Sequence, residues 1–158
     1  MSYELDAGEV SAVYRPVDQI PDLIRPKTAM KFVAPGSVTE GRYGLFRLDM
    51  QPRSGGPGAH FHRTFSESFY VLDGTVRLYD GAGWVSASAG DFLHVPEGGI
   101  HAFRNNGEAP ASMLILFAPG AAREEYFREA AQLAEAGREM SPDERAAFLA
   151  RHDQYMVE

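Results

Sequence analysis

Residues 43–117 form a series of short β-forming runs separated by turn residues, and this pattern limits the chain to an antiparallel sandwich or barrel. The most legible turn is Asp73-Gly74, which lies between the runs 69–72 and 75–79. An Asp-Gly pair suits a two-residue hairpin, because both central residues of such a turn need positive φ. Residues 80–83 and 105–107 supply further turns. The sequence therefore predicts an antiparallel meander with long excursions.

Apolar and polar residues alternate along these runs. Phe46, Leu48 and Met50 share one face of their run, and Arg47 and Asp49 take the other. The runs 75–79 and 103–104 alternate in the same way, so one face of each strand is expected to be apolar and the other wet. Residues 113–117 are apolar on both faces, and we expect their outer side to contact a partner chain or the C-terminal helices.

The segments that flank these runs have different patterns. Residues 1–40 contain four prolines between positions 16 and 35, which favours an irregular or extended arm. From residue 123 the apolar period becomes helical. It places Tyr126, Ala130, Leu133 and Ala134 on one face, and Gly137 suits the C-terminal end of this helix.

A second helix is predicted to begin after Ser141. Ser141 can cap it, Pro142 fits its first turn, and Glu144 can close a capping box, while Phe148 and Leu149 would anchor it. We therefore expect an arm over 1–40, a barrel over 41–119 and a helical tail over 120–158. A length of 158 residues suits one structural domain that includes all three.

Charge and composition exclude several classes of function. The 22 acidic residues exceed the 15 basic residues by seven, which disfavours nucleic acid and membrane surfaces as partners. The absence of cysteine excludes disulfides, thiolate nucleophiles and zinc fingers. The first ten residues lack the basic start and apolar run of a signal peptide, and no apolar stretch approaches the length of a membrane span. These features predict a cytoplasmic protein.

Three histidines and one glutamate are the candidates for chemistry. His60 and His62 are two residues apart, a spacing that points both imidazoles to the same face of a strand. Glu67 shares the parity of Phe69, so its carboxylate is predicted to point into the interior, where an unpaired charge costs several kcal/mol. His101 begins another run on a predicted inward face. A divalent cation would offset the charge of the buried carboxylate.

Other polar residues fit structural roles better. His94 has the opposite parity from His101 and is interpreted as a structural histidine. His152 is interpreted as a solvated or capping side chain near a helix C-terminus. Ser66 and Ser68 flank the glutamate without a base nearby in the sequence, which disfavours a hydrolase nucleophile.

The spacing of these residues resembles the cupin superfamily over residues 43–117. The second cupin motif is matched at every position, by Gly90, Pro96, Gly98, His101 and Asn105. The later part of the first motif is matched by His60, His62, Glu67 and Gly74, whereas Ser54 stands where the motif opens on glycine, next to Gly55 and Gly56. The resemblance implies an all-β, antiparallel cupin barrel (jelly-roll sandwich) with a two-helix C-terminal tail. It also implies that His60, His62, Glu67 and His101 are the metal ligands.

An ion that accepts six ligands would keep up to two positions open beside these four. Mixed imidazole and carboxylate ligation suits Fe, Ni, Mn, Co, Cu or Zn, and we expect one such divalent metal per chain. An apolar, partly aromatic pocket for a small, flat substrate is expected around it. Its predicted lining residues are Phe46, Leu48, Met50, Phe69, Val71, Val76, Phe103, Met113, Ile115 and Phe117.

The leading functional hypothesis is an oxygen-dependent dioxygenase in which Glu67 acts as ligand and proton acceptor. It depends on a resemblance of residues 66–74 and of the helical tail to quercetin-dioxygenase-like small cupins. A redox-neutral isomerase or polyketide cyclase, and a module that binds a small ligand without turnover, are the two alternatives. Exposed strand edges predict a homodimer in which the arm crosses to a neighbour, and the tail is either a lid or a dimer contact.

Overall fold

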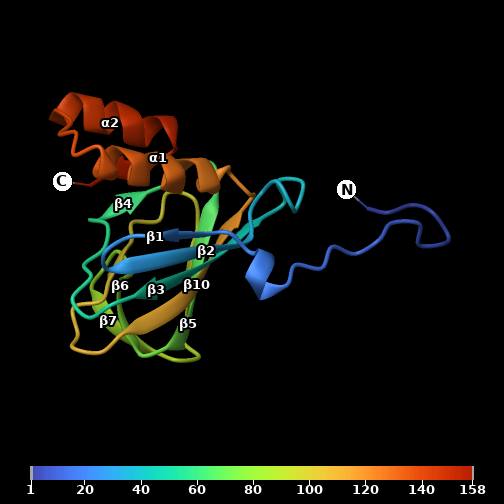
Figure 1. Ribbon diagram of the computed structural model, residues 1–158, viewed down its shortest axis with the longest axis horizontal. Helices are drawn as coiled ribbons and strands as arrows, with labels where there is room; N and C mark the ends of the chain where they lie inside the picture. The colour runs from blue at the N-terminus through green and yellow to red at the C-terminus, as the bar shows by residue number, and fades with distance from the viewer. Residues whose placement is uncertain (1, 158) are drawn as a thin grey trace.

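The computed structural model describes residues 2–157 and consists mainly of antiparallel strands with two helices (Figure 1). One sheet has six strands in the order β1-β2-β3-β10-β5-β8. These strands are β1 (Asp22–Ile24), β2 (Thr28–Ala34), β3 (Gly44–Met50), β10 (Ala111–Ala118), β5 (Ser66–Asp73) and β8 (Phe92–Val95). A second sheet has the order β7-β6-β9, with β7 (Trp84–Ser88), β6 (Thr75–Tyr79) and β9 (Ala102–Arg104). The helices are a short 3-10 turn η1 (Val17–Gln19), α1 (Arg123–Glu135) and α2 (Pro142–Arg151).

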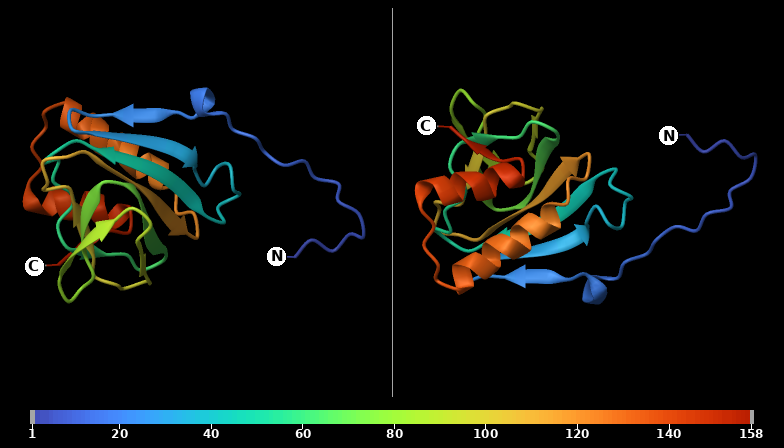
Figure 2. Two further views of the ribbon diagram at one scale, coloured as in Figure 1. Left: turned by 90° about the horizontal axis from the view of Figure 1, so that it is seen from below. Right: turned by 90° about the horizontal axis from the view of Figure 1, so that it is seen from above.

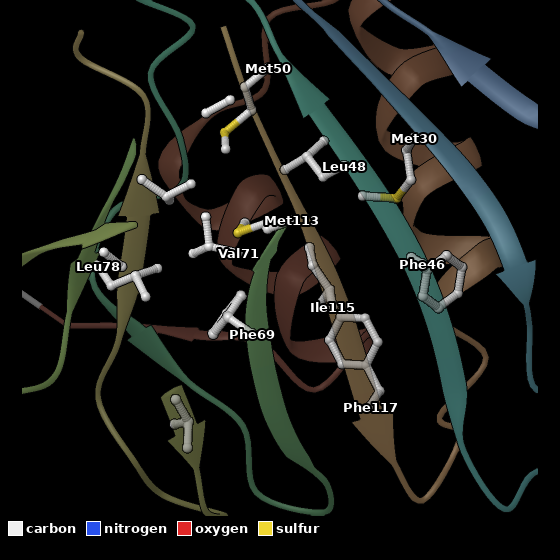
Figure 3. Packing of buried hydrophobic residues seen from close by; sticks show 14 of the residues in the cluster. Met30, Phe46, Leu48, Met50, Phe69, Val71, Leu78, Met113, Ile115 and Phe117 are labelled. Carbon is white, nitrogen blue, oxygen red and sulfur yellow. The ribbon is translucent and has the colours of Figure 1, made fainter. Parts of the chain in front are cut away.

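The core consists of the inward faces of these strands. Phe46, Leu48 and Met50 of β3 are buried, as the alternation predicted, and Arg47 between them is exposed. Figure 3 shows the side chains of β3, β5 and β10 gathered among the strands. Period-two alternation therefore identified the buried face of β3 correctly.

The Asp73-Gly74 turn joins the two sheets and is not a hairpin. Gly74 has φ of 72°, as the dipeptide predicted. However, β5 pairs with β10 and β8, whereas β6 pairs with β7 and β9, so the turn is a corner between sheets. A Cβ on Gly74 would lie 2.4 Å from the carbonyl oxygen of Pro110, which explains why the corner needs glycine.

The predicted arm over 1–40 is wrong for its second half. Strand β2 pairs with β3 inside the larger sheet, and its Met30 and Phe32 are buried in the core. Of the four prolines that suggested an irregular segment, Pro26 and Pro35 flank β2 and do not interrupt the ladder. Residues 2–16 have no helix or strand and extend away from the sheets in Figures 1 and 2.

Both predicted helices are present, but the most buried residues of α1 lie beside the predicted face, whose Tyr126, Ala130 and Leu133 are half-buried. These buried residues are Arg123 and Ala131, and Phe127 packs between them against the core, whereas Ala134 is exposed. The ring of Phe127 lies 5.3 Å from that of Phe46, so α1 packs against inward-facing residues. The tail therefore leaves the outer side of β10 uncovered, where Leu116 is 36% exposed. Cover of this side by a second chain stays a prediction.

The second helix has the predicted start, and the chain after it is not helical. Ser141 and Glu144 form the capping box, and Phe148 and Leu149 are buried. The chain then forms β11 (Tyr155–Met156), which pairs with β4 (His60–Phe61). The C-terminal tail thus adds a strand beside the first predicted metal ligand. Within residues 2–157, neither helix is long and apolar enough to cross a membrane.

Candidate metal centre

The four predicted ligands lie together. The possible ligand atoms of His60, His62, Glu67 and His101 are all within 4.8 Å of one another, and all four residues are buried. His60 is in β4, Glu67 is in β5, and His101 directly precedes β9. The backbones of His60 and His101 are joined by two reciprocal N–H to O hydrogen bonds of 3.0 Å. This bridge holds the two imidazoles side by side.

Each of the three imidazoles is oriented by a backbone carbonyl. The Nδ1 atoms of His60, His62 and His101 lie 2.8, 2.6 and 3.0 Å from the carbonyl oxygens of Gly58, Asp153 and Gly99, respectively. A carbonyl oxygen can only accept, so each Nδ1 carries a hydrogen and donates it. In the neutral ring the Nε2 atom then presents a lone pair, which is the arrangement of metal-binding histidines.

These lone pairs face a carboxylate. Oε2 of Glu67 lies 3.0 Å from Nε2 of His62 and 2.8 Å from Nε2 of His101. Two acceptors at such a distance repel each other unless a proton or a metal ion lies between them. Three imidazole nitrogens and one carboxylate oxygen are also a donor set that divalent transition metals accept. The residues present therefore fit a metal ion of this class.

The pKa values of the cluster agree with this geometry. Burial raises the pKa of Glu67, but the hydrogen bonds from His101 and His62 outweigh it and hold that pKa well below its usual range. Burial opposes protonation of His101, yet the bond to Glu67 raises its pKa overall. Burial and the charge of His101 lower the pKa of His60 to about 4, so this ring is neutral at pH 7 and its lone pair is free.

The tail supplies a support for His62 that sequence reasoning missed. The carbonyl that accepts from His62 belongs to Asp153, a residue 91 positions away. The carboxylate of Asp153 in turn accepts from the backbone N–H groups of Arg63 and Thr64 and from the Thr64 hydroxyl. Asp153 thus ties the loop after β4 to the end of α2. No local signal in the sequence indicates this contact.

A cavity of about 500 Å³ adjoins the cluster, and His60 and Glu67 are in its wall. Five predicted pocket residues line it, namely Leu48, Met50, Phe103, Ile115 and Phe117. The other five, Phe46, Phe69, Val71, Val76 and Met113, are in the buried core and not in the cavity wall. The helical tail contributes wall residues that were not predicted, including Tyr126, Phe127 and Leu149. The cavity is therefore bounded by both strands and tail.

The remaining candidates lie outside the cluster. His94 is exposed, and its Nδ1 is 2.9 Å from Oγ of Ser68, so the prediction that this serine has no nearby base is wrong. Neither residue is in the cavity wall. Ser66 donates its hydroxyl to the carbonyl of Ala118. His152 is the C-cap residue of α2, as predicted, and its Nε2 lies 2.8 Å from Glu129.

The second motif also has structural roles. The side-chain amide of the buried Asn105 donates to the carbonyls of Gln51 and Ala109, and its Oδ1 accepts from the N–H of Gly107. These bonds fix the connection between β9 and β10. The profile of the family described as Cupin domain matches residues 46–117, which contain both motifs and all four clustered residues.

Residues 46–117, slightly less than half of the chain, are a cupin domain. A curated relative, quercetin 2,3-dioxygenase of Bacillus subtilis (strain 168), is 32% identical to this cupin over 69 residues. The match covers 44% of this chain but only 20% of that protein, so the two share one segment of a longer enzyme.

Solved structures show the same fold. KdgF from Halomonas sp. is 18% identical with a TM-score of 0.59, over 68% of this cupin and 94% of that chain. The polyketide cyclase RemF from Streptomyces resistomycificus is 19% identical with a TM-score of 0.56, over 70% of this cupin and 80% of that chain. At these identities the likeness concerns the jelly-roll fold alone.

Proposed function

We propose that this cupin is a metal-dependent enzyme, and specifically an oxygen-dependent dioxygenase that acts on a small, largely apolar molecule. The observation that supports this most directly is the position of the cluster. Three carbonyl-oriented imidazoles and one carboxylate converge at a cavity of about 500 Å³, a volume suited to a small ligand. One divalent Fe, Ni, Mn, Co, Cu or Zn ion per chain fits the donors, and it would supply Lewis acidity and, if redox-active, access to dioxygen.

The chain's own residues would share the remaining tasks. His60, His62 and His101 would hold the ion through Nε2, because their Nδ1 atoms are engaged with carbonyls. Glu67 would bind the ion and accept the proton of a phenol or enol hydroxyl. The apolar wall that includes Leu48 and Phe103 would orient a flat ring and keep water from the site.

The dioxygenase assignment is supported by the segment shared with quercetin 2,3-dioxygenase, which is 32% identical over 69 residues. That segment is one fifth of the length of the relative, so the activity of the relative is only proposed for this chain. A redox-neutral isomerase or cyclase would use the same four ligands. The choice between these reactions depends on the metal and on oxygen consumption, which can both be measured.

The test begins with elemental analysis of protein purified without added metal. Samples reconstituted with each candidate metal are then assayed with an oxygen electrode against flavonols and phenols. We expect oxygen uptake with a redox-active metal, and its loss in His60→Gln. The matched control is His94→Gln, which removes an exposed imidazole outside the cluster and should keep full activity. Turnover with zinc alone and no oxygen uptake would contradict dioxygenation, and binding without turnover by every metal form would contradict an enzyme.

Assembly and location remain proposals. A homodimer would cover the outer side of β10 and the exposed apolar residues of the arm, such as Val10 and Tyr14, which are 81% and 87% exposed. Light scattering of the purified chain, with and without residues 2–16, tests this proposal. A monomer in both samples would contradict it. We also propose a cytoplasmic location.

A further inference from the structure

Arg123 is a buried cation in the wall of the cavity. It is the first residue of α1 and is only 4% exposed. Its guanidinium carbon lies 4.1 Å from the ring centre of Tyr126, and three further aromatic rings surround it. Nη1 donates to the carbonyl of His152 at 2.9 Å, and Nη2 donates to Oε1 of Gln154 at 3.1 Å. Both partners are uncharged, and the buried Nε has no partner among the described residues.

The carboxylates of Glu67 and Asp153 act on this guanidinium through space and do not contact it. Within residues 2–157, no carboxylate forms an ion pair with Arg123. Burial lowers the pKa of Arg123, and the charge of Glu67 is the largest effect that opposes this. If Glu67 binds a divalent cation, its charge is already engaged. A buried cation without a counter-ion is costly, so the site favours a ligand that brings negative charge.

The charge around the cavity also favours an anionic ligand. Three exposed cations, Arg25, Lys27 and Arg145, line the cavity together with Arg123, and among residues 2–157 Glu67 is the single carboxylate in the wall. The chain as a whole has a net charge of −7. Basic residues are thus concentrated at the cavity of an acidic protein. Such a local excess attracts anions and raises their rate of association.

We propose that Arg123 binds the carboxylate of the substrate, and that the substrates are small organic carboxylates with an apolar or aromatic body. This inference rests on the proposed function and specifies its substrate class. The planar fork of a guanidinium matches the two oxygens of a carboxylate, and the free Nε supplies one of its donors. The apolar wall that includes Leu48 and Phe103 receives the body of the molecule.

The test compares 2-naphthoate with its neutral amide, 2-naphthamide, by isothermal titration calorimetry. The full chain is first treated with EDTA, so that a carboxylate–metal contact does not contribute. We expect the carboxylate to bind about tenfold or more tightly than the amide, since hydrogen bonds to charged groups are among the stronger ones. Arg123→Gln should abolish this preference. Arg128→Gln, an exposed arginine on the same helix outside the cavity wall, should retain it.

A second arm does not depend on the folding of the Arg123 variant. Arg25→Gln with Arg145→Gln removes two exposed charges at the cavity and should slow naphthoate association at low salt, with no change for the amide. The proposal is overturned if the wild-type chain does not prefer the carboxylate, if folded Arg123→Gln keeps the preference, or if phenyl phosphate binds more tightly than naphthoate. Because these measurements use metal-free protein, their failure is distinct from a failure of metal binding or oxygen uptake.

Discussion

Replacement of Asp153 by alanine tests whether the C-terminal tail positions a metal ligand. The carboxylate of Asp153 accepts hydrogen bonds from the N–H groups of Arg63 and Thr64 at 3.0 and 2.8 Å and from the Thr64 hydroxyl at 2.7 Å. Asp153 also has φ of 54°, a conformation that disfavours alanine by about 1 kcal/mol. Its carbonyl meanwhile lies 2.6 Å from Nδ1 of His62. The substitution therefore frees the carbonyl that orients this ligand.

The size of the effect follows from these contacts. Each hydrogen bond to a charged group contributes about 1.5–3 kcal/mol. The donors lie at the surface and can bind water after the substitution, so we expect a total loss of stability of only about 2–3 kcal/mol. Loss of a group that supports a metal-binding histidine weakens metal binding by about 10–100-fold. Asp153→Asn keeps one acceptor oxygen and tolerates positive φ, so its effect should be intermediate.

The assay is competition for Zn²⁺ with a chromophoric chelator, alongside thermal unfolding. Asp6→Ala is the matched control, because it removes the same charge from an exposed position in the arm. We expect this control to behave as wild type in both measurements. A folded Asp153→Ala variant with wild-type affinity for Zn²⁺ would refute the positioning role of the tail.

Three further predictions concern the cluster and its frame. Glu67→Gln should abolish stoichiometric metal binding, measured by elemental analysis, because it removes the anionic ligand. In metal-free protein the bond to Glu67 raises the pKa of His101 above its unfolded value of 6.5. The stability that this bond contributes is therefore fully present below pH 6.5, and it is lost as the pH rises through the pKa of His101 in the folded protein. The Tm measured with EDTA should therefore fall above pH 6.5. With added metal the Tm should instead rise with pH, because fewer protons compete with the metal for the imidazole nitrogens. A Tm that rises with pH in EDTA would contradict the ion pair between His101 and Glu67. Gly56→Ala should cost about 3 kcal/mol or more, because its Cβ would lie 1.7 Å from the carbonyl oxygen of Phe103. Gly83→Ala, where no heavy atom lies within 4 Å of the added Cβ, should leave the Tm unchanged.

Local patterns predicted much of this cupin because their physical basis is local. Successive side chains of a strand point to opposite faces, so the buried face of β3 could be identified from Phe46, Leu48 and Met50. The start of α2 could be identified because Ser141 and Glu144 bond to each other's backbone within one turn. The same reasoning predicted wrongly where two local signals competed, as in β2, whose flanking prolines obscured the alternation.

Longer-range features required the folded chain. The helical period of residues 123–136 did not indicate that Arg123 would be buried, because the aromatic rings around its guanidinium include Phe65 and Phe117, which are distant in the sequence. The Asp73-Gly74 turn has the predicted positive φ at Gly74. However, β5 and β6 on either side of this turn do not pair with each other, because β10 lies beside β5.

The sequence by itself determined that three imidazoles and a carboxylate would share one interior. The direction of a side chain on a strand is set by its own backbone, and the spacing of His60, His62 and Glu67 fixes it within a few residues. Only the tertiary structure decided that Asp153 orients His62 and that Arg123 faces the cavity. These contacts join residues far apart in the chain, and they form only when the tail packs against the sandwich and brings α1 and β11 beside the strands.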